Sequence, residues 1–221
     1  MYEKFGQFID GKWQASSNKE TYEVINPANE EVIGRASKAT PEDVDRALKS
    51  AEKGLEVWKK TSPWKRSSVI RKIADLIRAK QDVLAKWITL EVGKPFLEGK
   101  GEVGATADIF EWNSEETKRI YGQTVESRFE DTRIHVYYQP IGVVAAMSPW
   151  NFPLVLSGRK ISTALAAGCS VIIKPDVIAP GGVMELVDIC REAGVPPGVV
   201  NLLSGDPPSI ASQLILSLIH I

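Results

Sequence analysis

The stretch IGVVAAMSPWNFP, residues 141–153, decides the fold class of this chain. Residues 141–147 are apolar without alternation, which is typical of a strand buried on both faces of a parallel sheet. Two prolines, Pro149 and Pro153, then restrict the backbone on either side of Asn151. The pattern predicts a buried strand that ends in a rigid turn carrying one carboxamide.

Predicted helices and strands alternate along the rest of the chain. A helix is predicted in 154–168, a strand in 170–174, a helix in about 179–193 and a strand in 199–203. Apolar strands joined by crossovers long enough for a helix predict a parallel sheet covered on both faces. The fold class is therefore α/β, with a doubly wound, Rossmann-like parallel sheet.

In such a sheet, ligands bind beyond the carboxyl ends of the strands. Three short segments, 148–151, 174–176 and 204–205, stand at the carboxyl ends of the three predicted strands. We therefore expect them to lie at one edge of the sheet and to form the site.

The part of the chain before the sheet is predicted to be an excursion of short strands followed by helices. Residues 8–37 alternate and are broken by Gly and Asn-Pro, which indicates antiparallel strands. A helix is expected over 40–58, with Thr40 as its N-cap. A longer helical segment begins at Ser62 and ends at Gly93.

A hairpin is predicted in 119–139, where two alternating runs flank Glu130 and Asp131. His135 falls in it and is interpreted as a strand residue on a solvated face. The hairpin divides the chain into an N-terminal part of the cofactor-binding domain, 1–118, the hairpin itself, and a Rossmann-like core, 140–221.

Composition narrows the class of protein. The 221 residues are 43% hydrophobic and 25% charged, and 27 Lys and Arg against 28 Asp and Glu give a net charge of −1. No stretch concentrates basic residues together with aromatic ones, so nucleic acid is not an expected partner. No apolar run approaches about 18 residues and the N-terminus does not resemble a leader, so we expect a cytoplasmic protein without membrane contact.

Two features could be mistaken for functional sites. Cys169 and Cys190 have no metal-ligand spacing, so packed thiols are expected and no metal site. GKGEVG, residues 99–104, matches the letters of the dinucleotide fingerprint G-x-G-x-x-G. It follows a helical segment instead of a strand, so we expect a helix start before residue 105 and no phosphate contact.

Five motifs together carry a family resemblance. They are INPANEEVIG (25–34), EVGKP (91–95), PWNFP (149–153), GRKISTALAAGCSVIIKP (158–175) and GVPPGVVNLLSG (194–205). In this order they resemble the aldehyde dehydrogenase superfamily over roughly residues 5–212. The resemblance implies oxidation of an aldehyde to a carboxylic acid, with NAD or NADP, through a thiohemiacetal and a thioester on a cysteine.

The resemblance also assigns roles to single residues. Asn151 matches the asparagine whose side-chain N–H donates to the substrate oxygen, a task for which a carboxamide on a rigid turn is suited. Lys160 matches a lysine with a supporting role in proton or electrostatic relay. The alternatives are that Asn151 bonds its own turn and that Lys160 is merely solvated. The residues implied to bind the cofactor are Met147, Ser148, Pro149, Trp150, Lys174, Pro175, Asp176, Val177 and Gly205.

Cofactor choice stays open at this stage. NAD-preferring relatives carry a glutamate at the place of Val177, whereas here the acid is Asp176, one residue earlier. Asp176 favours ribose hydroxyls and hence NAD, and Val177 removes a barrier to the 2′-phosphate of NADP. Arg159 matches an arginine that holds the substrate carboxylate in succinate semialdehyde dehydrogenases, so an acidic semialdehyde is the favoured substrate.

The family's nucleophilic cysteine, its water-activating glutamate and a second glycine motif all lie beyond residue 221. We therefore expect a truncated N-terminal piece that lacks the catalytic domain and is inactive alone, with 213–221 of open origin. The parent is expected to be a homodimer or homotetramer paired through the hairpin. The alternatives are a non-catalytic dinucleotide-binding or assembly module, and an unrelated doubly wound protein in which PWNFP is only a rigid turn.

Overall fold

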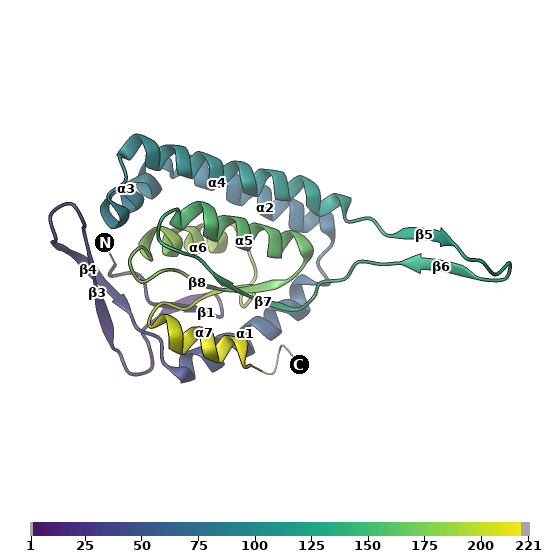
Figure 1. The fold of residues 1–221 in the computed structure, drawn as a ribbon, viewed down its shortest axis with the longest axis horizontal. Coiled ribbons are helices and arrows are strands. Elements are labelled where there is room, and N and C mark those ends of the chain that lie inside the picture. The colour runs from purple at the N-terminus through teal and green to yellow at the C-terminus, as the bar shows by residue number, and fades with distance from the viewer. Residues whose placement is uncertain (1, 218–221) are drawn as a thin grey trace.

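A five-stranded sheet forms the centre of the computed structural model, which describes residues 2–217 (Figure 1). The strands β7 (Val143–Met147), β8 (Ser170–Lys174) and β9 (Val200–Leu202) are parallel, as predicted. Two N-terminal strands, β1 (Gln7–Ile9) and β2 (Lys12–Gln14), extend the sheet antiparallel beyond β9. The sheet is therefore mixed, in the order β2-β1-β9-β8-β7, whereas a parallel sheet was expected.

The antiparallel extension is held by one buried amide. The side chain of Gln7 donates to the carbonyls of Ser37 and Ser204 at 3.2 and 3.0 Å and accepts from Ser204 N–H at 2.8 Å. Phe8, beside it, pairs with Leu202 and is buried. These contacts join the start of the chain to the carboxyl end of β9.

Helices cover both faces of the sheet (Figure 1). One face carries α5 (Pro153–Ala167) and α6 (Gly181–Ala193), and the other carries α1 (Pro41–Trp58) and α7 (Pro207–Ile215). An outer layer of α2 (Pro63–Ala79), α3 (Gln81–Val92) and α4 (Phe96–Glu116) packs on α5 and α6. The doubly wound prediction is confirmed, with this outer layer added to it.

The strand β8 shows why its sequence is apolar without alternation. Val171 and Ile173 belong to the core cluster under α5 and α6, while Ile172 belongs to the cluster under α1 and α7. All three side chains are fully buried. Each face of the sheet therefore has its own core.

Helix boundaries agree with the local signals in most places. Thr40 and Asp43 form the capping box of α1, with N–H to oxygen distances of 2.9 and 3.3 Å. The segment expected as one helical run from Ser62 to Gly93 is two helices, separated at Lys80. Gly93 ends α3 with φ +74°, a conformation that suits glycine.

The GKGEVG segment lies inside α4. The absence of a preceding strand was predicted correctly, and the glycines lie near the start of a helix as expected, since α4 begins at Phe96. Gly99 has a packing role, since a Cβ there would lie 3.2 Å from the carbonyl oxygen of Ala85 in α3. The residues do not form a phosphate loop.

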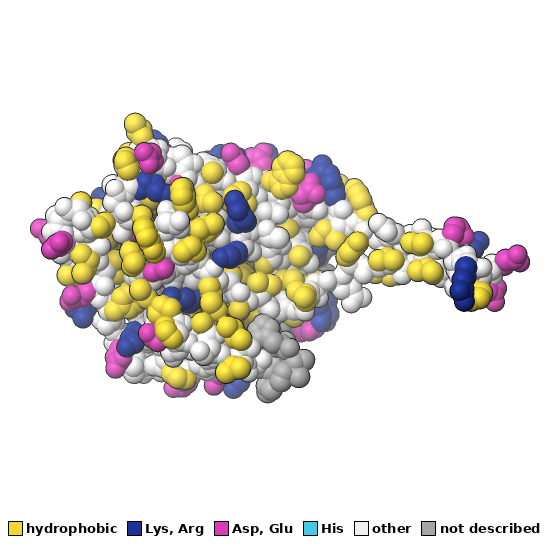
Figure 2. Space-filling view, in the orientation of Figure 1, with side chains coloured by type: hydrophobic (Ala, Val, Ile, Leu, Met, Phe, Trp, Pro, Cys, Tyr) yellow, Lys and Arg dark blue, Asp and Glu magenta, His cyan; other side chains and the backbone are white. Residues whose placement is uncertain are grey.

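Two hairpins lie outside the main sheet. β3 (Thr21–Ile25) pairs with β4 (Val32–Ser37), and β5 (Gln123–Glu126) pairs with β6 (Arg133–Val136). The second projects far from the body, as Figure 1 shows, and Figure 2 shows apolar side chains along it and charged ones at its tip. His135 is an exposed strand residue there, as predicted. None of the described helices is long and apolar enough to cross a membrane.

Candidate active site

The carboxyl ends of β7 and β8 meet at one edge of the sheet. Met147 pairs with Lys174 in the parallel register, and the N–H of Ser148 donates to the Lys174 carbonyl at 3.2 Å. The turn 148–152 and the segment that follows Lys174 therefore start side by side. The sequence placed these segments together correctly.

Asn151 lies exposed in the turn between β7 and α5. Its side-chain oxygen Oδ1 accepts the N–H of Phe152 at 3.1 Å, and its backbone carbonyl accepts from Lys94 Nζ at 3.2 Å. Within residues 2–217, Nδ2 has no acceptor. The amide is thus oriented through its oxygen, with its N–H donors free for a ligand.

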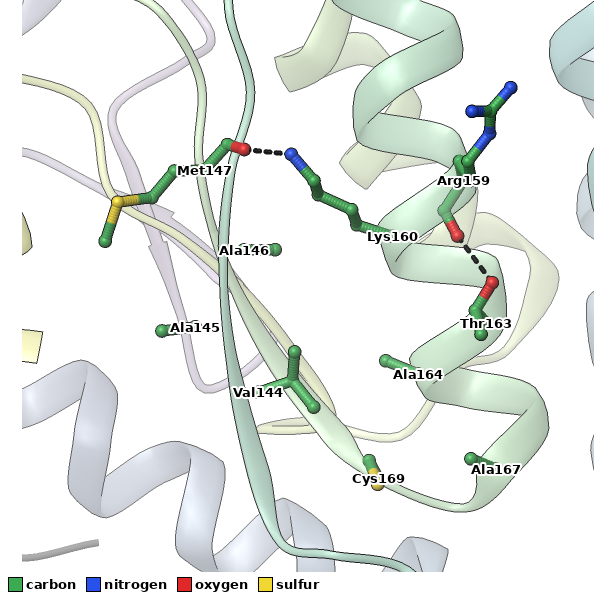
Figure 3. Close-up of a pocket in the computed structure, with 10 residues that line it drawn as sticks. All are labelled: Val144, Ala145, Ala146, Met147, Arg159, Lys160, Thr163, Ala164, Ala167 and Cys169. Atoms are coloured by element: carbon green, nitrogen blue, oxygen red, sulfur yellow. Dashed lines mark hydrogen bonds between the residues drawn. The ribbon is translucent and has the colours of Figure 1, made fainter. Parts of the chain in front are cut away.

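Lys160 reaches back from α5 to the end of β7. Its Nζ donates to the carbonyl oxygen of Met147, as the dashed line in Figure 3 shows. Arg159, one residue earlier, is exposed, and its guanidinium extends away from Met147. Lys160 is therefore held at the strand end, and the guanidinium of Arg159 lies on a different side of the helix.

A pocket of about 660 Å³ lies between β7 and α5. Figure 3 shows its small apolar lining from β7 and the polar side chains of α5 at one end. Its lining residues are Val144, Ala145, Ala146, Met147, Arg159, Lys160, Thr163, Ala164, Ala167 and Cys169. β7 is the outer strand of the described sheet, so this apolar pocket follows an open edge.

Lys174 is a buried cation at the end of β8, with 5% of its surface exposed. Burial lowers the pKa of its ammonium, and the nearby carboxylates of Asp176 and Asp206 oppose that shift. Within the described residues its Nζ has no hydrogen-bond partner. An unpartnered ammonium on a buried side chain in this position is suited to a ligand rich in oxygen.

The other residues expected at the cofactor differ in their access to solvent. Pro149 and Trp150 are exposed and Met147, Asp176 and Val177 are half-buried, whereas Pro175 is buried. Ser148 is also buried and its hydroxyl lies 2.7 Å from that of Ser157. The hydroxyl of Ser148 therefore has an internal partner.

Gly205 makes a close turn after β9. Its φ is +140°, and a Cβ there would lie 2.8 Å from the backbone nitrogen of Ala39. The neighbouring Ser204 hydroxyl lies 2.7 Å from that of Tyr22. Chain packing alone requires glycine at position 205, whatever else lies near it.

The two cysteines do not reach the turn. Both are buried, and burial raises the pKa of the Cys190 thiol to about 12. Cys169 lies at the amino end of β8. At about 3.3 Å per residue, β8 separates that end from the edge with Asn151 by roughly 13 Å. The prediction of packed thiols is confirmed, and the described residues hold no cluster able to bind a metal.

Sequence reasoning missed two residues that contact the turn. Lys94, of EVGKP, forms an ion pair with Glu102, of GKGEVG, and donates to the Asn151 carbonyl. Glu102 Oε1 accepts the backbone N–H groups of Leu154 and Val155 at 2.9 and 3.3 Å. Both residues stand in motifs that the sequence had singled out, but no local pattern links them to residue 151.

The fold is that of a doubly wound α/β protein whose polar groups gather beyond the carboxyl ends of its parallel strands. A family model described as "Aldehyde dehydrogenase family" matches residues 13–217. The chain therefore belongs to the aldehyde dehydrogenase family, as the resemblance implied.

Curated relatives and solved structures agree with this family. Glutarate-semialdehyde dehydrogenase of Pseudomonas putida is 40% identical over 207 residues, which is 94% of this chain and 43% of the relative. Succinate-semialdehyde dehydrogenase [NADP(+)] of Escherichia coli is 39% identical over 93% of this chain and 43% of the relative. A crystal structure of succinate-semialdehyde dehydrogenase from Burkholderia pseudomallei superposes with a TM-score of 0.93 at 37% identity, covering 95% of this chain and 44% of that one. The chain thus spans less than half the length of these relatives.

Proposed function

We propose that this chain is the N-terminal, cofactor-binding part of an NAD(P)-dependent aldehyde dehydrogenase that acts on an acidic semialdehyde. One observation supports this above all others. The Asn151 carboxamide is fixed through its oxygen, with its N–H donors free, at the edge where the buried Lys174 ammonium also lies. An amide donor and a lysine thus lie at one edge, where they would serve as the polarising donor and the cation for a dinucleotide.

The residues at the end of β8 fit a dinucleotide. The Lys174 side chain is buried and its ammonium has no hydrogen-bond partner among the described residues, and a ribose hydroxyl or a 2′-phosphate would supply one. Asp176 lies close enough to influence that ammonium, and Val177 places no charge beside it. When bound, the nicotinamide ring of NAD or NADP would supply the hydride acceptor.

Asn151 would act on the aldehyde oxygen. When a thiolate from the remainder of the enzyme adds to the carbonyl carbon, negative charge develops on that oxygen, and an Nδ2–H donor stabilises it. The amide need not reorganise, because the Phe152 N–H already holds its oxygen. The ammonium of Lys160, held at the Met147 carbonyl, would add positive charge near the same strand end.

The proposed substrate class follows from charge and from the relatives. The two curated relatives above are named for glutarate and succinate semialdehydes, both of which carry a carboxylate. Arg159 is an exposed guanidinium beside Lys160, free to approach such a carboxylate from the side of α5. Succinate semialdehyde is the first substrate to test.

The proposed organisation keeps three parts: 1–118, the hairpin 119–139 and the core 140–221. The hairpin is exposed along both strands and would pair with a neighbouring subunit in a dimer or tetramer. A non-catalytic dinucleotide-binding or assembly module would use the same elements without a reaction.

The test uses the full-length reading frame that contains residues 1–221. We expect it to reduce NAD or NADP when succinate semialdehyde is added, and Asn151→Ala to lower kcat by about 10²–10³-fold. Asn29→Ala, in the exposed turn between β3 and β4, is the matched control and should leave kcat unchanged. Tight dinucleotide binding without turnover of any aldehyde would instead identify the non-catalytic module.

A further inference from the structure

A buried ion pair lies behind the turn that carries Asn151. Lys94 stands between Gly93, which ends α3, and Pro95, which precedes α4, and its side chain is 11% exposed. Its partner Glu102 projects from α4 with a side chain only 1% exposed. The proposed function gives neither residue a role.

Each member of the pair has a second contact, and both contacts are on the turn. The ammonium of Lys94 donates to the Asn151 carbonyl at 3.2 Å and lies 3.7 Å from the centre of the Phe152 ring. The carboxylate of Glu102 accepts the N–H groups of Leu154 and Val155. The pair therefore holds both sides of the bend between Asn151 and the first turn of α5.

The start of α5 lacks a cap of its own. Its N-cap residue, Phe152, makes no side-chain hydrogen bond to the first turn. The first N–H groups of a helix have no partner within the helix and favour a negative charge. Glu102 supplies that charge from α4, which is the task that a capping Ser or Asp performs in other helices.

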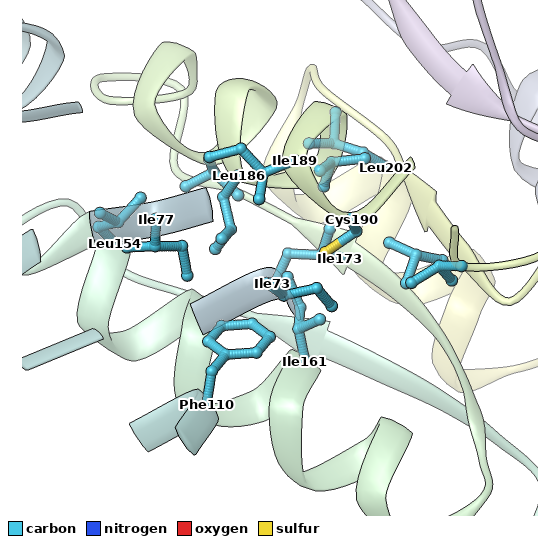
Figure 4. Packing of buried hydrophobic residues seen from close by; sticks show 14 of the residues in the cluster. Ile73, Ile77, Phe110, Leu154, Ile161, Ile173, Leu186, Ile189, Cys190 and Leu202 are labelled. Atoms are coloured by element: carbon cyan, nitrogen blue, oxygen red, sulfur yellow. The ribbon is translucent and has the colours of Figure 1, made fainter. Parts of the chain in front are cut away.

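The helix α4 is a firm support for this contact. Gly158 of α5 lies so close to α4 that a Cβ there would be 2.7 Å from Thr106 Cγ2. Figure 4 shows Phe110 of α4 beside Ile161 of α5, and both are fully buried. Asn113 Nδ2 also donates to Ser162 Oγ at 2.9 Å. Movement of Glu102 relative to α5 is therefore restricted.

Stability alone does not account for a buried carboxylate paired with a half-buried ammonium. Removing an ion pair from water is costly, and apolar residues of similar size are often as stabilising. An apolar pair could not make the hydrogen bonds to residues 151, 154 and 155. The bonds fix the direction in which the chain leaves β7.

We propose that Lys94 and Glu102 are positioning residues, which hold the turn 151–155 so that the Asn151 carboxamide is aimed at the substrate oxygen. This inference rests on the proposed function, because it gives Asn151 its task. It assigns a role to EVGKP and to the glutamate of GKGEVG. Neither residue touches substrate or cofactor in this assignment.

The kinetic test is a double-mutant cycle in the full-length protein. Lys94→Met should lower kcat by about tenfold or more and change the dinucleotide Kd by less than about twofold. In an Asn151→Ala background, the same substitution should change kcat by less than about twofold, because the group that it positions is gone. An equal loss of kcat in both backgrounds would overturn the proposal.

Three further variants separate positioning from folding. Lys100→Met breaks an exposed pair with Asp82 at 2.8 Å, also between α3 and α4, and should leave kcat unchanged. Lys94→Arg keeps a cation and should restore most of the activity that Lys94→Met loses. If Lys94→Met does not fold, Glu102→Gln, which keeps the size and one acceptor oxygen, takes its place in the cycle.

A readout without activity separates this inference from the proposed function. Glu102→Leu, which removes the oxygen that accepts both N–H groups, should speed hydrogen exchange at the amides of Leu154 and Val155 by about tenfold, with Val171 in β8 unchanged as the reference. Unchanged exchange at these amides would overturn the positioning role of Lys94 and Glu102, even in an active enzyme. If wild-type protein oxidises no aldehyde, the proposed function fails and the role assigned to Asn151 fails with it. Faster exchange in the variant would still show that Glu102 holds the turn 151–155.

Discussion

Lys174 is the residue on which the cofactor assignment depends. Its side chain is buried, and no hydrogen-bond partner for its ammonium is found within the described part of the chain. A charge-assisted hydrogen bond contributes about 1.5–3 kcal/mol, so Lys174→Ala in the full-length protein should weaken dinucleotide binding by about tenfold or more. The loss should be greater for NADP, whose 2′-phosphate adds charge.

Isothermal calorimetry measures this directly. Lys60→Ala is the control, because Lys60 lies between α1 and α2 and its side chain is 75% exposed. Equal affinities of wild type and Lys174→Ala for both dinucleotides would remove Lys174 from the site.

Glu91, of EVGKP, gives a prediction about pH. Its carboxylate accepts the N–H groups of Gly181 and Gly182 at 2.6 and 3.2 Å and the hydroxyl of Tyr2. Burial raises its pKa from 4.5 to about 7. Between these pH values the folded state keeps a proton that the unfolded state has released, so the free energy of unfolding falls as pH rises through this window.

Glu91→Gln removes that titration. Each unit of pKa shift corresponds to about 1.4 kcal/mol, so wild type should lose stability relative to Glu91→Gln between about pH 4.5 and 7 and no further above that. Denaturant unfolding at a series of pH values checks this. Parallel stability curves for the two proteins would show that Glu91 does not carry a raised pKa.

Arg159 bears on substrate choice. Its guanidinium is exposed and could pair with the carboxylate of a semialdehyde. Arg159→Gln in the full-length enzyme should lower kcat/KM for succinate semialdehyde by about tenfold or more and leave an uncharged aldehyde of similar length almost unaffected. Arg35→Gln, an exposed arginine in β4, is the control. An equal loss for both aldehydes would exclude recognition of the carboxylate.

At the scale of helices and strands, the sequence predicts well what local signals encode. The capping box at Thr40, the apolar run of β8 and the glycine that ends α3 all mark boundaries within a few residues. The antiparallel pairing of β1 with β9 was not predicted, because it joins Phe8 to Leu202 across almost the whole chain. The break at Lys80 was missed because neither glycine nor proline marks it.

The candidate site also has a part that local sequence signals predict and a part that depends on contacts between distant residues. The placement of Asn151 and Lys174 at one edge of the sheet could be predicted, because each lies at or shortly after the carboxyl end of an apolar strand. The contact of Lys94 and Glu102 with residues 151–155 could not, since it depends on how α4 packs against α5. Local spacing carries no information about such a contact.

The hairpin is the element that gives a prediction about assembly. Val125 and Ile134 pair across it and are 42% and 44% exposed, so their apolar surface is free to meet another subunit. The full-length protein should be a dimer or tetramer by light scattering. Val125→Lys with Ile134→Glu keeps an attractive cross-strand pair and should lower the mass of the assembly.

Ile25→Lys is the control for this change, since Ile25 is 49% exposed on β3, outside the hairpin. A wild-type mass equal to that of a monomer at micromolar concentration would contradict the proposed pairing. So would an unchanged mass in the double variant, because the hairpin would then lie outside the interface.

For the molecule as a whole, the question is whether residues 1–221 can perform the reaction alone. Hydride leaves an aldehyde readily only after a nucleophile has added to its carbonyl carbon. The chain has two cysteines, and both are buried, one with a raised pKa and the other at the opposite end of β8 from Asn151. The chain therefore has the proposed donor, Asn151, and the proposed cofactor cation, Lys174, but neither of its cysteines lies beside them.

We accordingly expect purified residues 1–221 to show no sustained turnover of succinate semialdehyde with NAD or NADP, followed by the absorbance of the reduced cofactor. Elements of such a site act together, so losing the nucleophile removes most of the rate even where binding survives. Turnover that disappears on Cys169→Ser or Cys190→Ser would contradict this, because one of these buried thiols would then have to reach the substrate. Turnover that survives both substitutions would mean that hydride transfer here proceeds without a cysteine, and the role of Asn151 as donor to a thiohemiacetal oxygen would have to be abandoned.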